Sequence, residues 1–283
     1  MDLTAEVERN VAAALSEDVG PGDWTAMLTP EGQRARATIV CREQAVLCGT
    51  QWADACFRRL DPDARLEWQA KDGQQLAPGA AVCRMEGSTR ALLTGERTAL
   101  NFLQTLSAVA TQTRRYVEAV AGTRAKIVDT RKTIPGLRLA QKYAVRTGGG
   151  VNHRLGLYDG MLIKENHIAA AGGVARALHA ARKVAPSGVW IQIEVETLAQ
   201  LGEALASGAT MILLDNMTPG TMREAVGITA GRAELEASGG ITLETVRAIA
   251  ETGVDRISIG SLTKDVKAVD LSMRFAWGLP QEC

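Results

Sequence analysis

The second half of the chain repeats one pattern: a short apolar run ends in a polar residue and is followed by a segment with helical periodicity. Apolar runs of this kind are typical of parallel strands covered on both faces. The runs are KIVD (126–129), GMLIK (160–164), VWIQIE (189–194), TMILLD (210–215), AELEAS (233–238) and DRISIG (255–260). The later runs recur about every 20 to 23 residues. Because this region is short for eight units, the repeat predicts an open, incomplete (β/α) barrel of six to seven parallel strands.

The alternative for such a repeat is an open, doubly wound sheet that binds a nucleotide. That fold is usually marked by a GxGxxG or GxxxxGK[ST] segment after a strand, and neither occurs in the chain. The sequence therefore favours the barrel.

The first part of the chain has a different pattern. Apolar residues at helical spacing over 3–15 predict an amphipathic helix. Strand-like runs at 37–41, 45–49, 65–70 and 81–85 surround a helical segment at 52–60, and 89–120 are helical as one helix or two joined near Ser107. We expect an N-terminal α+β sandwich domain over residues 1–107 and an α/β barrel catalytic domain over 108–265. Residues 266–283 are expected to form a C-terminal helix that packs back on the N-terminal domain.

Composition excludes several classes of protein. Lys+Arg and Asp+Glu both number 32, and this balance argues against a nucleic-acid-binding or membrane-surface protein. The five cysteines show no CxxC spacing, so neither a disulfide framework nor a zinc site is expected, and a reducing cytoplasm is the expected location. The polar, acidic N-terminus does not resemble a signal peptide, and no apolar run reaches about 18 residues.

Cationic residues concentrate between positions 129 and 167. This stretch holds seven Lys/Arg and two of the three histidines against three acids. Catalytic groups of a barrel lie at the C-terminal ends of its strands, so Arg131, Lys132 and Lys164 should face one mouth, with His153 and Arg154 beside them. Arginine binds carboxylates in a bidentate manner, and the set could therefore hold a small acid with more than one carboxylate. Individual members could instead pair with nearby acids at the surface.

Acidic and glycine-rich segments follow the later strands. Glu194 and Asp215 end two strands, where carboxylates can hold Mg²⁺, accept bonds from sugar hydroxyls or merely cap a helix. SGG (238–240) and IGS (259–261) precede helices, and such turns let backbone N–H groups approach a phosphate. Glu196 and His167 are weaker candidates, and His179 is expected to be structural.

Eight segments in order resemble those of the quinolinate phosphoribosyltransferase family: GERTALNFLQTLSAVAT, DTRKTIPGLR, QKYAV followed by GGG, NHR and GLYD, LIKENH, IEVET, LLDNM, EASGGI and SIGSLTK. The resemblance covers essentially the whole chain. It implies a dimer or larger homo-oligomer that uses Mg²⁺, and no organic cofactor, to join quinolinate to 5-phosphoribosyl-1-pyrophosphate. The implied products are nicotinate mononucleotide, pyrophosphate and CO₂.

The resemblance also implies roles for individual residues. Arg131, His153, Arg154 and Lys164 resemble the quinolinate-binding set, and Arg97 resembles an arginine that reaches the neighbouring subunit's site. Lys132, Glu194 and Asp215 are the implied catalytic residues: Lys132 between the two substrates, and the two carboxylates at the ribose and, directly or indirectly, at the metal. The implied phosphate-site residues are Ser238, Gly239, Gly240, Gly260 and Ser261, with Thr130 and Ile259 completing the substrate-binding set. Lys264 departs from the histidine that some members carry.

Three other functions fit parts of the pattern. A transferase of the same fold could act on a monocarboxylate such as nicotinate, although the number of cations favours a dicarboxylate. A barrel lyase or isomerase acting on phosphosugars would need a clear acid/base pair and would leave Arg131 and Arg154 unexplained. A non-enzymatic binding role would leave Glu194 and Asp215 without a catalytic task.

Overall fold

The computed structural model describes residues 2–276, and the chain divides into two compact units that are each built from separate segments. The first unit comprises residues 2–112, 134–148 and 265–276, and the second comprises 113–133 and 149–264. This is a two-domain α/β fold, as predicted. The predicted continuous barrel domain 108–265 is wrong for residues 134–148, which pack in the first unit.

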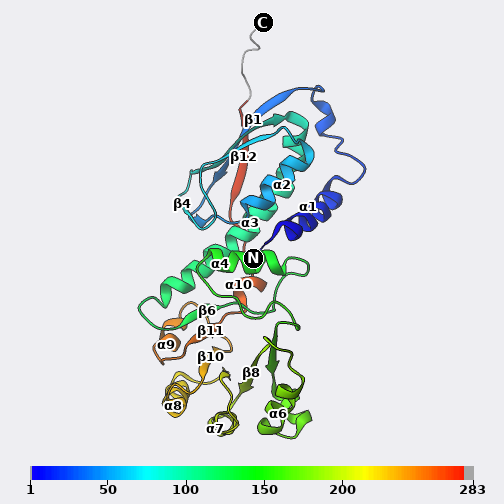
Figure 1. Ribbon diagram of the computed structural model, residues 1–283. Coiled ribbons are helices and arrows are strands. Elements are labelled where there is room, and N and C mark those ends of the chain that lie inside the picture. The colour runs from blue at the N-terminus through cyan, green and yellow to red at the C-terminus, as the bar shows by residue number, and fades with distance from the viewer. Residues whose placement is uncertain (1, 277–283) are drawn as a thin grey trace. The chain divides into compact units, whose positions relative to one another are not determined.

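The first unit is built on an antiparallel sheet of four strands in the order β12-β1-β5-β3 (Figure 1). These strands are β1 (Arg34–Cys41), β3 (Arg65–Trp68), β5 (Ala81–Ser88) and β12 (Leu271–Ala276), and β2 (Ala45–Val46) pairs separately with β4 (Gln75–Leu76). Its helical elements are α1 (Thr4–Val19), the 3₁₀ turn η1 (Ala26–Leu28), α2 (Thr50–Leu60), most of α3 (Thr89–Ala119) and α4 (Arg138–Thr147). The predicted amphipathic helix and the strands near 37, 65 and 81 are confirmed, and 89–119 form one helix.

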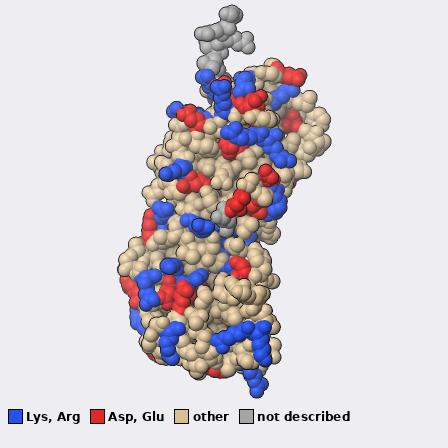
Figure 2. All heavy atoms as spheres, viewed as in Figure 1, with Lys and Arg blue, Asp and Glu red and all other residues tan. Residues whose placement is uncertain are grey.

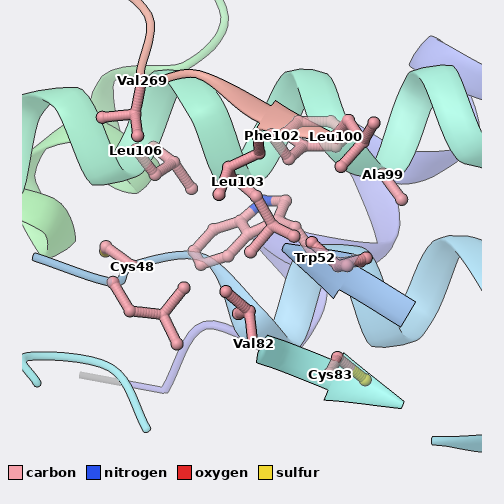
Figure 3. Packing of buried hydrophobic residues seen from close by; sticks show 14 of the residues in the cluster. Cys48, Trp52, Val82, Cys83, Ala99, Leu100, Phe102, Leu103, Leu106 and Val269 are labelled. Atoms are coloured by element: carbon pink, nitrogen blue, oxygen red, sulfur yellow. The ribbon is translucent and has the colours of Figure 1, made fainter. Parts of the chain in front are cut away.

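The core of this unit is packed around Trp52 of α2, which is fully buried. Figure 3 shows its ring between Leu103 and Leu106 of α3 on one side and Val82 of β5 on the other. The indole Nε1 donates to Asn10 Oδ1 at 3.1 Å, so the one polar atom of the ring is satisfied. Burial of each aliphatic side chain in this core stabilises the folded state by about 1.5–3 kcal/mol.

Helix α4 joins the first unit because its apolar face is buried there. Ala140, Ala144 and Val145 belong to the same hydrophobic core as Trp52, and the Tyr143 ring lies 5.7 Å from the Trp52 ring. Tyr143 Oη also donates to Asp72 at 2.8 Å. The sequence between two barrel strands therefore leaves the barrel, which a repeat pattern alone does not reveal.

The C-terminal segment is a strand, and the predicted helix over 266–283 is wrong for its described part. Residues 271–276 form β12, which pairs antiparallel with β1 from Leu271↔Cys41 to Ala276↔Arg36. Leu271 and Met273 are buried, while Ser272 between them is less so, as expected for a half-buried strand. Residues 277–283 of the predicted helix lie outside the described residues.

The second unit is a six-stranded parallel sheet in the order β6-β11-β10-β9-β8-β7. Its strands are β6 (Lys126–Val128), β7 (Gly160–Ile163), β8 (Trp190–Val195), β9 (Met211–Asp215), β10 (Glu234–Ser238) and β11 (Arg256–Ser258). The sheet is not closed, because β6 and β7 are its two ends in the described chain. The predicted open barrel of six to seven parallel strands is thus confirmed with six.

Helices connect these strands and cover the outer face of the sheet (Figure 1). They are α5 (Glu165–Ala171), α6 (Val174–Val184), α7 (Leu198–Ala206), α8 (Pro219–Thr229) and α9 (Val246–Ala250). The short α10 (Ser261–Lys264) follows β11, the last strand of this sheet in the sequence. Thr197 and Thr218 cap α7 and α8 through their hydroxyls, and Pro219 follows at the first helical position.

Surface charge is mixed. On the face shown in Figure 2, Lys/Arg and Asp/Glu side chains alternate without a large field of one sign. In the part of the chain that the structure describes, no helix combines the length and the hydropathy needed to cross a membrane.

Candidate active site

Polar side chains of the second unit meet at the carboxyl ends of the parallel strands. Side chains two residues apart share one face of a strand, so Gln192 and Glu194 of β8 point the same way, as do Glu236 and Ser238 of β10. Leu213 of β9 is in register with both Glu194 and Glu236. Glu194, Leu213, Glu236 and Ser238 border a cavity of about 160 Å³. Its lining residues are Asp129, Thr130, Arg131, Lys132, His153, Arg154, Leu162, Lys164, Glu194, Leu213, Glu236, Ser238 and Ser258.

The cavity brings together five predicted cationic residues and three other predicted residues. Thr130, Arg131, Lys132, His153, Arg154 and Lys164 line it with Glu194 and Ser238. Asp215 does not line the cavity but is in register with Ser238 at the end of the neighbouring strand. Gly239, Gly240, Ile259, Gly260 and Ser261 directly follow the strand ends that border it. Arg97 lies in the first unit, exposed on α3.

Arg131 and Arg154 bring two guanidinium groups to the cavity. Arg154 is 9% exposed, and its Nη1 donates to the Gly160 carbonyl at 2.9 Å. Burial, and then the charge of Arg131, lower the pKa of the Arg154 guanidinium from its ordinary value. The Nε of Arg131 is buried without a hydrogen-bond partner. Two guanidinium groups held this way would be stabilised by an anion with carboxylate geometry.

Lys164 and Glu194 join the cationic and acidic sides of the cavity. Lys164 Nζ lies 3.0 Å from Glu194 Oε2, in an ion pair whose carboxylate is largely buried and whose lysine is half-exposed. Burial raises the pKa of Glu194; Lys164 opposes that rise, and Asp215 adds to it. The two sides expected from the sequence therefore touch. Substrate binding must either use this pair together or exchange its partners.

The turn after β9 is fixed by Asn216 and Gly239. Asn216 has a left-handed backbone (φ 53°), its N–H donates to the Ser238 carbonyl at 2.9 Å, and its amide donates to Asp215 Oδ2 at 2.7 Å. A Cβ on Gly239, which has φ +109°, would lie 2.0 Å from Asn216 Oδ1. Glycine is therefore required at 239 on two grounds, and it keeps the Asp215 carboxylate oriented beside Ser238.

Lys132 is held by the loop after β6 and by the turn after β11. Its N–H donates to Thr130 Oγ1 at 3.0 Å, and its carbonyl accepts from Thr263 Oγ1 at 2.7 Å. A Cβ on Gly260 would lie 3.2 Å from Lys132 Cδ. The absence of a side chain at 260 lets the lysine stem cross this turn.

The ring of His153 faces the protein. Nδ1 accepts from the Arg154 N–H at 2.8 Å, and Nε2 lies 2.9 Å from Gln192 Oε1. The histidine is only 8% exposed, although it lines the cavity. Its expected role as a direct ligand of the substrate stays a prediction, and these contacts indicate that it also holds its neighbour.

Family models match the chain along most of its length: quinolinate phosphoribosyl transferase, N-terminal domain, over residues 23–107, and the C-terminal domain of the same family over 109–274. The chain belongs to the quinolinate phosphoribosyltransferase family.

Named relatives and solved structures agree with this membership. The chain is 46% identical over 257 residues to the probable nicotinate-nucleotide pyrophosphorylase [carboxylating] of Bacillus subtilis, covering 91% of this chain and 89% of the relative. It is 38% identical to quinolinate phosphoribosyltransferase [decarboxylating] 1b of Nicotiana tabacum, covering 96% and 83%. The nicotinate-nucleotide pyrophosphorylase structure from Francisella tularensis matches with a TM-score of 0.93 at 44% identity, covering 96% of each chain.

Two polar cavity residues that lie within strands, Glu236 and Ser258, are not among those predicted from the sequence. Gln192 of β8 was also missed; it donates to Glu236 but does not line the cavity. A signal was present, because glutamine and glutamate interrupt runs of otherwise apolar strand residues in VWIQIE and AELEAS. Strand ends are the usual place of barrel chemistry, and a search confined to them passes over polar residues inside the strands.

Protein side chains alone do not form a metal site within the described residues. Within residues 2–276, no group of three or more His, Cys, Asp and Glu side chains is arranged to hold a metal ion. Glu194 and Asp215 offer two carboxylates, of which the first is paired with Lys164. That donor set fits Mg²⁺, which commonly takes one or two carboxylates and completes its shell with phosphate oxygens and water.

Proposed function

We propose that this family member transfers the phosphoribosyl group of 5-phosphoribosyl-1-pyrophosphate to quinolinate, with loss of CO₂, to give nicotinate mononucleotide and pyrophosphate. This pentosyl transfer would serve de novo NAD synthesis. The names of the relatives support it, and the observation that carries it is the Arg131–Arg154 pair beside Lys164 in one small cavity.

The acid pocket suits a dicarboxylate better than a monocarboxylate. Quinolinate has carboxylates on adjacent ring carbons, and the one cavity offers the guanidinium groups of Arg131 and Arg154 and the ammonium groups of Lys132 and Lys164. Burial and then repulsion from Arg131 lower the pKa of Arg154, and two negative charges would offset both effects more fully than one. Leu162 and Leu213 supply apolar surface for the pyridine ring.

The acidic side would serve the sugar. The quinolinate nitrogen attacks ribose C1′, and the bond from C1′ to pyrophosphate breaks with positive charge developing on the ribose. Glu194 and Asp215 would stabilise that charge electrostatically and accept hydrogen bonds from ribose hydroxyls. Mg²⁺, when bound with the phosphosugar, would neutralise charge on the pyrophosphate. Lys132 would contact the phosphosugar, and the turns at 238–240 and 259–261 would bind the 5′-phosphate.

Decarboxylation then needs no organic cofactor. When the bond to the 2-carboxylate breaks, CO₂ leaves and the electron pair stays on ring carbon 2, where the positive charge of the adjacent pyridinium nitrogen stabilises it. That carbon then takes a proton from solvent. The buried guanidinium groups must release this carboxylate, so a pocket that binds it too tightly would slow the step.

The deciding experiment measures pyrophosphate and CO₂ from quinolinate plus phosphoribosyl pyrophosphate, with and without Mg²⁺, and repeats the assay with nicotinate. We expect both products from quinolinate in equal amounts, only with the metal. Preferential use of nicotinate would show that the acid substrate is a monocarboxylate and not quinolinate. If neither acid yielded pyrophosphate, phosphoribosyl transfer would be refuted.

The enzyme is proposed to act as a homodimer or larger homo-oligomer in which Arg97 enters the neighbour's site. Arg97 is exposed on α3, and beside that helix the segment from Asp23 to Thr29 is held by Thr94 and Arg90. This segment exposes Trp24, Met27 and Leu28, and large exposed apolar side chains that cluster are typical of an interface.

Subunit mixing tests the shared site. Arg97→Ala and Glu194→Ala should each be inactive alone, and heterodimers of the two should recover activity, because one site per dimer would contain neither change. Verified heterodimers without recovery would contradict sharing.

A cytoplasmic location is proposed on the four described cysteines, which are all free and buried.

A further inference from the structure

A chain of polar side chains crosses the interior of the second unit, where barrels ordinarily pack branched aliphatic residues. It consists of Glu236 in β10, Gln192 in β8 and His153 at the mouth, and these are 0%, 1% and 8% exposed. A buried polar chain is costly unless each member is satisfied, so its presence beside the acid pocket calls for a reason.

The contacts fix the donor and the acceptor in the hydrogen bonds that link His153, Gln192 and Glu236. The Arg154 backbone N–H can only donate, so the His153 Nδ1 at 2.8 Å must carry a lone pair. The ring hydrogen of the neutral histidine is then on Nε2, which donates to Gln192 Oε1 at 2.9 Å. The Gln192 amide, so oriented, donates from Nε2 to Glu236 Oε2 at 3.2 Å.

Glu236 is anchored from its other side. Arg256 Nε lies 3.2 Å from Glu236 Oε2 as an ion pair, with the arginine side chain 14% exposed and also near Glu234. Since a carboxylate accepts and does not donate, Glu236 requires the amide edge of Gln192 and leaves its carbonyl edge for His153. The charge at 236 therefore favours the histidine tautomer with its hydrogen on Nε2, both through Gln192 and directly, because Glu236 Oε1 lies 3.7 Å from His153 Nε2.

The other end of the chain is the acid pocket. His153 also donates its own N–H to Asp129 Oδ1 at 2.8 Å, so the backbone on both sides of the histidine is fixed by side-chain acceptors. The next side chain, Arg154, lines the cavity. A shift of its backbone would move the guanidinium relative to Arg131.

We propose that Gln192 and Glu236 are positioning residues, which hold His153 in its Nε2–H form so that Nδ1 anchors the Arg154 backbone and keeps the two guanidinium groups matched to the carboxylates of the acid substrate. The identity of that substrate rests on the proposed function. The tautomer of His153 and the anchoring of the Arg154 backbone are independent of it.

The first test is spectroscopic and needs no substrate. The chain has three histidines, so long-range ¹H–¹⁵N spectra of the imidazoles are simple, and His153→Asn assigns the signal. We expect His153 to show the neutral Nε2–H pattern in the wild type and to lose that fixed pattern in Gln192→Leu. An unchanged Nε2–H pattern for His153 in a folded Gln192→Leu protein would contradict the proposal that Gln192 holds the tautomer of His153.

The second test separates the substrates. Gln192→Leu should raise KM for quinolinate by about tenfold while KM for phosphoribosyl pyrophosphate changes by less than about twofold. The double variant Gln192→Glu/Glu236→Gln keeps an acceptor for His153 and an amide to bridge the two positions, so it should recover most of the affinity. Equal losses for both substrates, or none, would contradict positioning at the acid pocket.

A control and a fallback keep the result decisive. Thr252→Val removes a buried hydroxyl that donates to the Ile249 carbonyl at 2.6 Å, so it should lower stability without changing either KM. If Gln192→Leu does not fold, Gln192→Asn breaks the same contact with a shorter amide. A wild type that does not use quinolinate would refute the proposed function and the substrate part of this inference. The imidazole spectrum would still decide whether Gln192 and Glu236 hold the tautomer of His153.

Discussion

At the scale of single residues, the site combines buried charges, such as Arg154 and Glu194, with more exposed ones, such as Lys132 and Lys164. The sequence predicted which strand-end residues meet, because parallel strands bring their carboxyl ends to one edge of a sheet. It did not predict that Lys164 pairs with Glu194, or that both ring nitrogens of His153 are engaged by protein atoms. Those contacts depend on side-chain direction, which the residue type at a strand end does not determine.

Replacing Glu194 by glutamine should alter how stability depends on pH. Burial raises the pKa of Glu194, so the folded protein retains a proton that the unfolded chain has released. The free energy of unfolding of the wild type therefore falls as pH rises from the ordinary glutamate range to the raised pKa, and the loss is then constant. Glu194→Gln lacks this loss, so its stability relative to wild type should improve across that window and be level outside it.

Urea denaturation at a series of pH values measures this difference. The pH-independent offset from leaving Lys164 unpaired is subtracted by comparing only the change across the window. Lys164→Met provides the contrast, because Lys164 opposes the rise in the pKa of Glu194 and its removal should extend the window to higher pH. Parallel curves for wild type and Glu194→Gln would contradict the raised pKa.

Adding a methyl group at Gly260 should impair the enzyme without unfolding it. The new Cβ would lie 3.2 Å from Lys132 Cδ and 3.7 Å from Thr130 Oγ1, so the flexible lysine stem must move. We expect kcat/KM to fall by about tenfold or more, since small displacements of positioned groups are costly in catalysis. Steady-state kinetics with a thermal melt decides it: an unchanged kcat/KM would show that Lys132 does not need this turn.

At the scale of elements, the sequence predicted the parallel strands well because each is apolar throughout and bounded by polar residues. It did worse where a segment was short or its partner was remote. The alternation of Leu271, Met273 and Phe275 is strand-like, but six residues cannot distinguish a strand from a helical turn when the partner, β1, lies more than 200 positions earlier. Helix α4 was assigned to the wrong unit for the same reason.

Two helices carry glycines that contribute nothing to packing. A Cβ added at Gly202 in α7 or at Gly227 in α8 would meet no neighbouring atom within 4 Å, and neither residue has a left-handed backbone. Gly202→Ala and Gly227→Ala should each stabilise the protein by about 0.5–1 kcal/mol, because alanine loses less backbone entropy in a helix. Chemical denaturation measures the gain, and activity should be unaltered. Destabilisation by either would indicate a contact not present in the structure.

At the scale of the whole molecule, stability of the first unit depends on residues from both ends of the chain. Leu271 is 5% exposed in the core that also contains Val7 and Ile39, whereas Ser272 points to the other face of β12. Leu271→Ala should cost about 2–5 kcal/mol, the range for an aliphatic side chain removed from a core.

Ser272→Ala is the matched control for that substitution. It loses only the contact from Arg42 Nε, and exposed substitutions of this kind usually cost less than about 0.5 kcal/mol. Urea unfolding followed by tryptophan fluorescence should show the large shift for Leu271→Ala alone. Similar small shifts for both variants would mean that β12 contributes little to the unit.

The last described strand, β12, has a consequence for synthesis of the protein. Nascent chains generally fold in the order in which their domains emerge from the ribosome. Here the sheet of the first unit lacks its edge strand until residues 271–276 have been made, while every residue of the second unit precedes position 265. The unit whose first residues are translated first is therefore the unit that is completed last. The edge of β1 that pairs with β12 stays unpaired until the end of elongation.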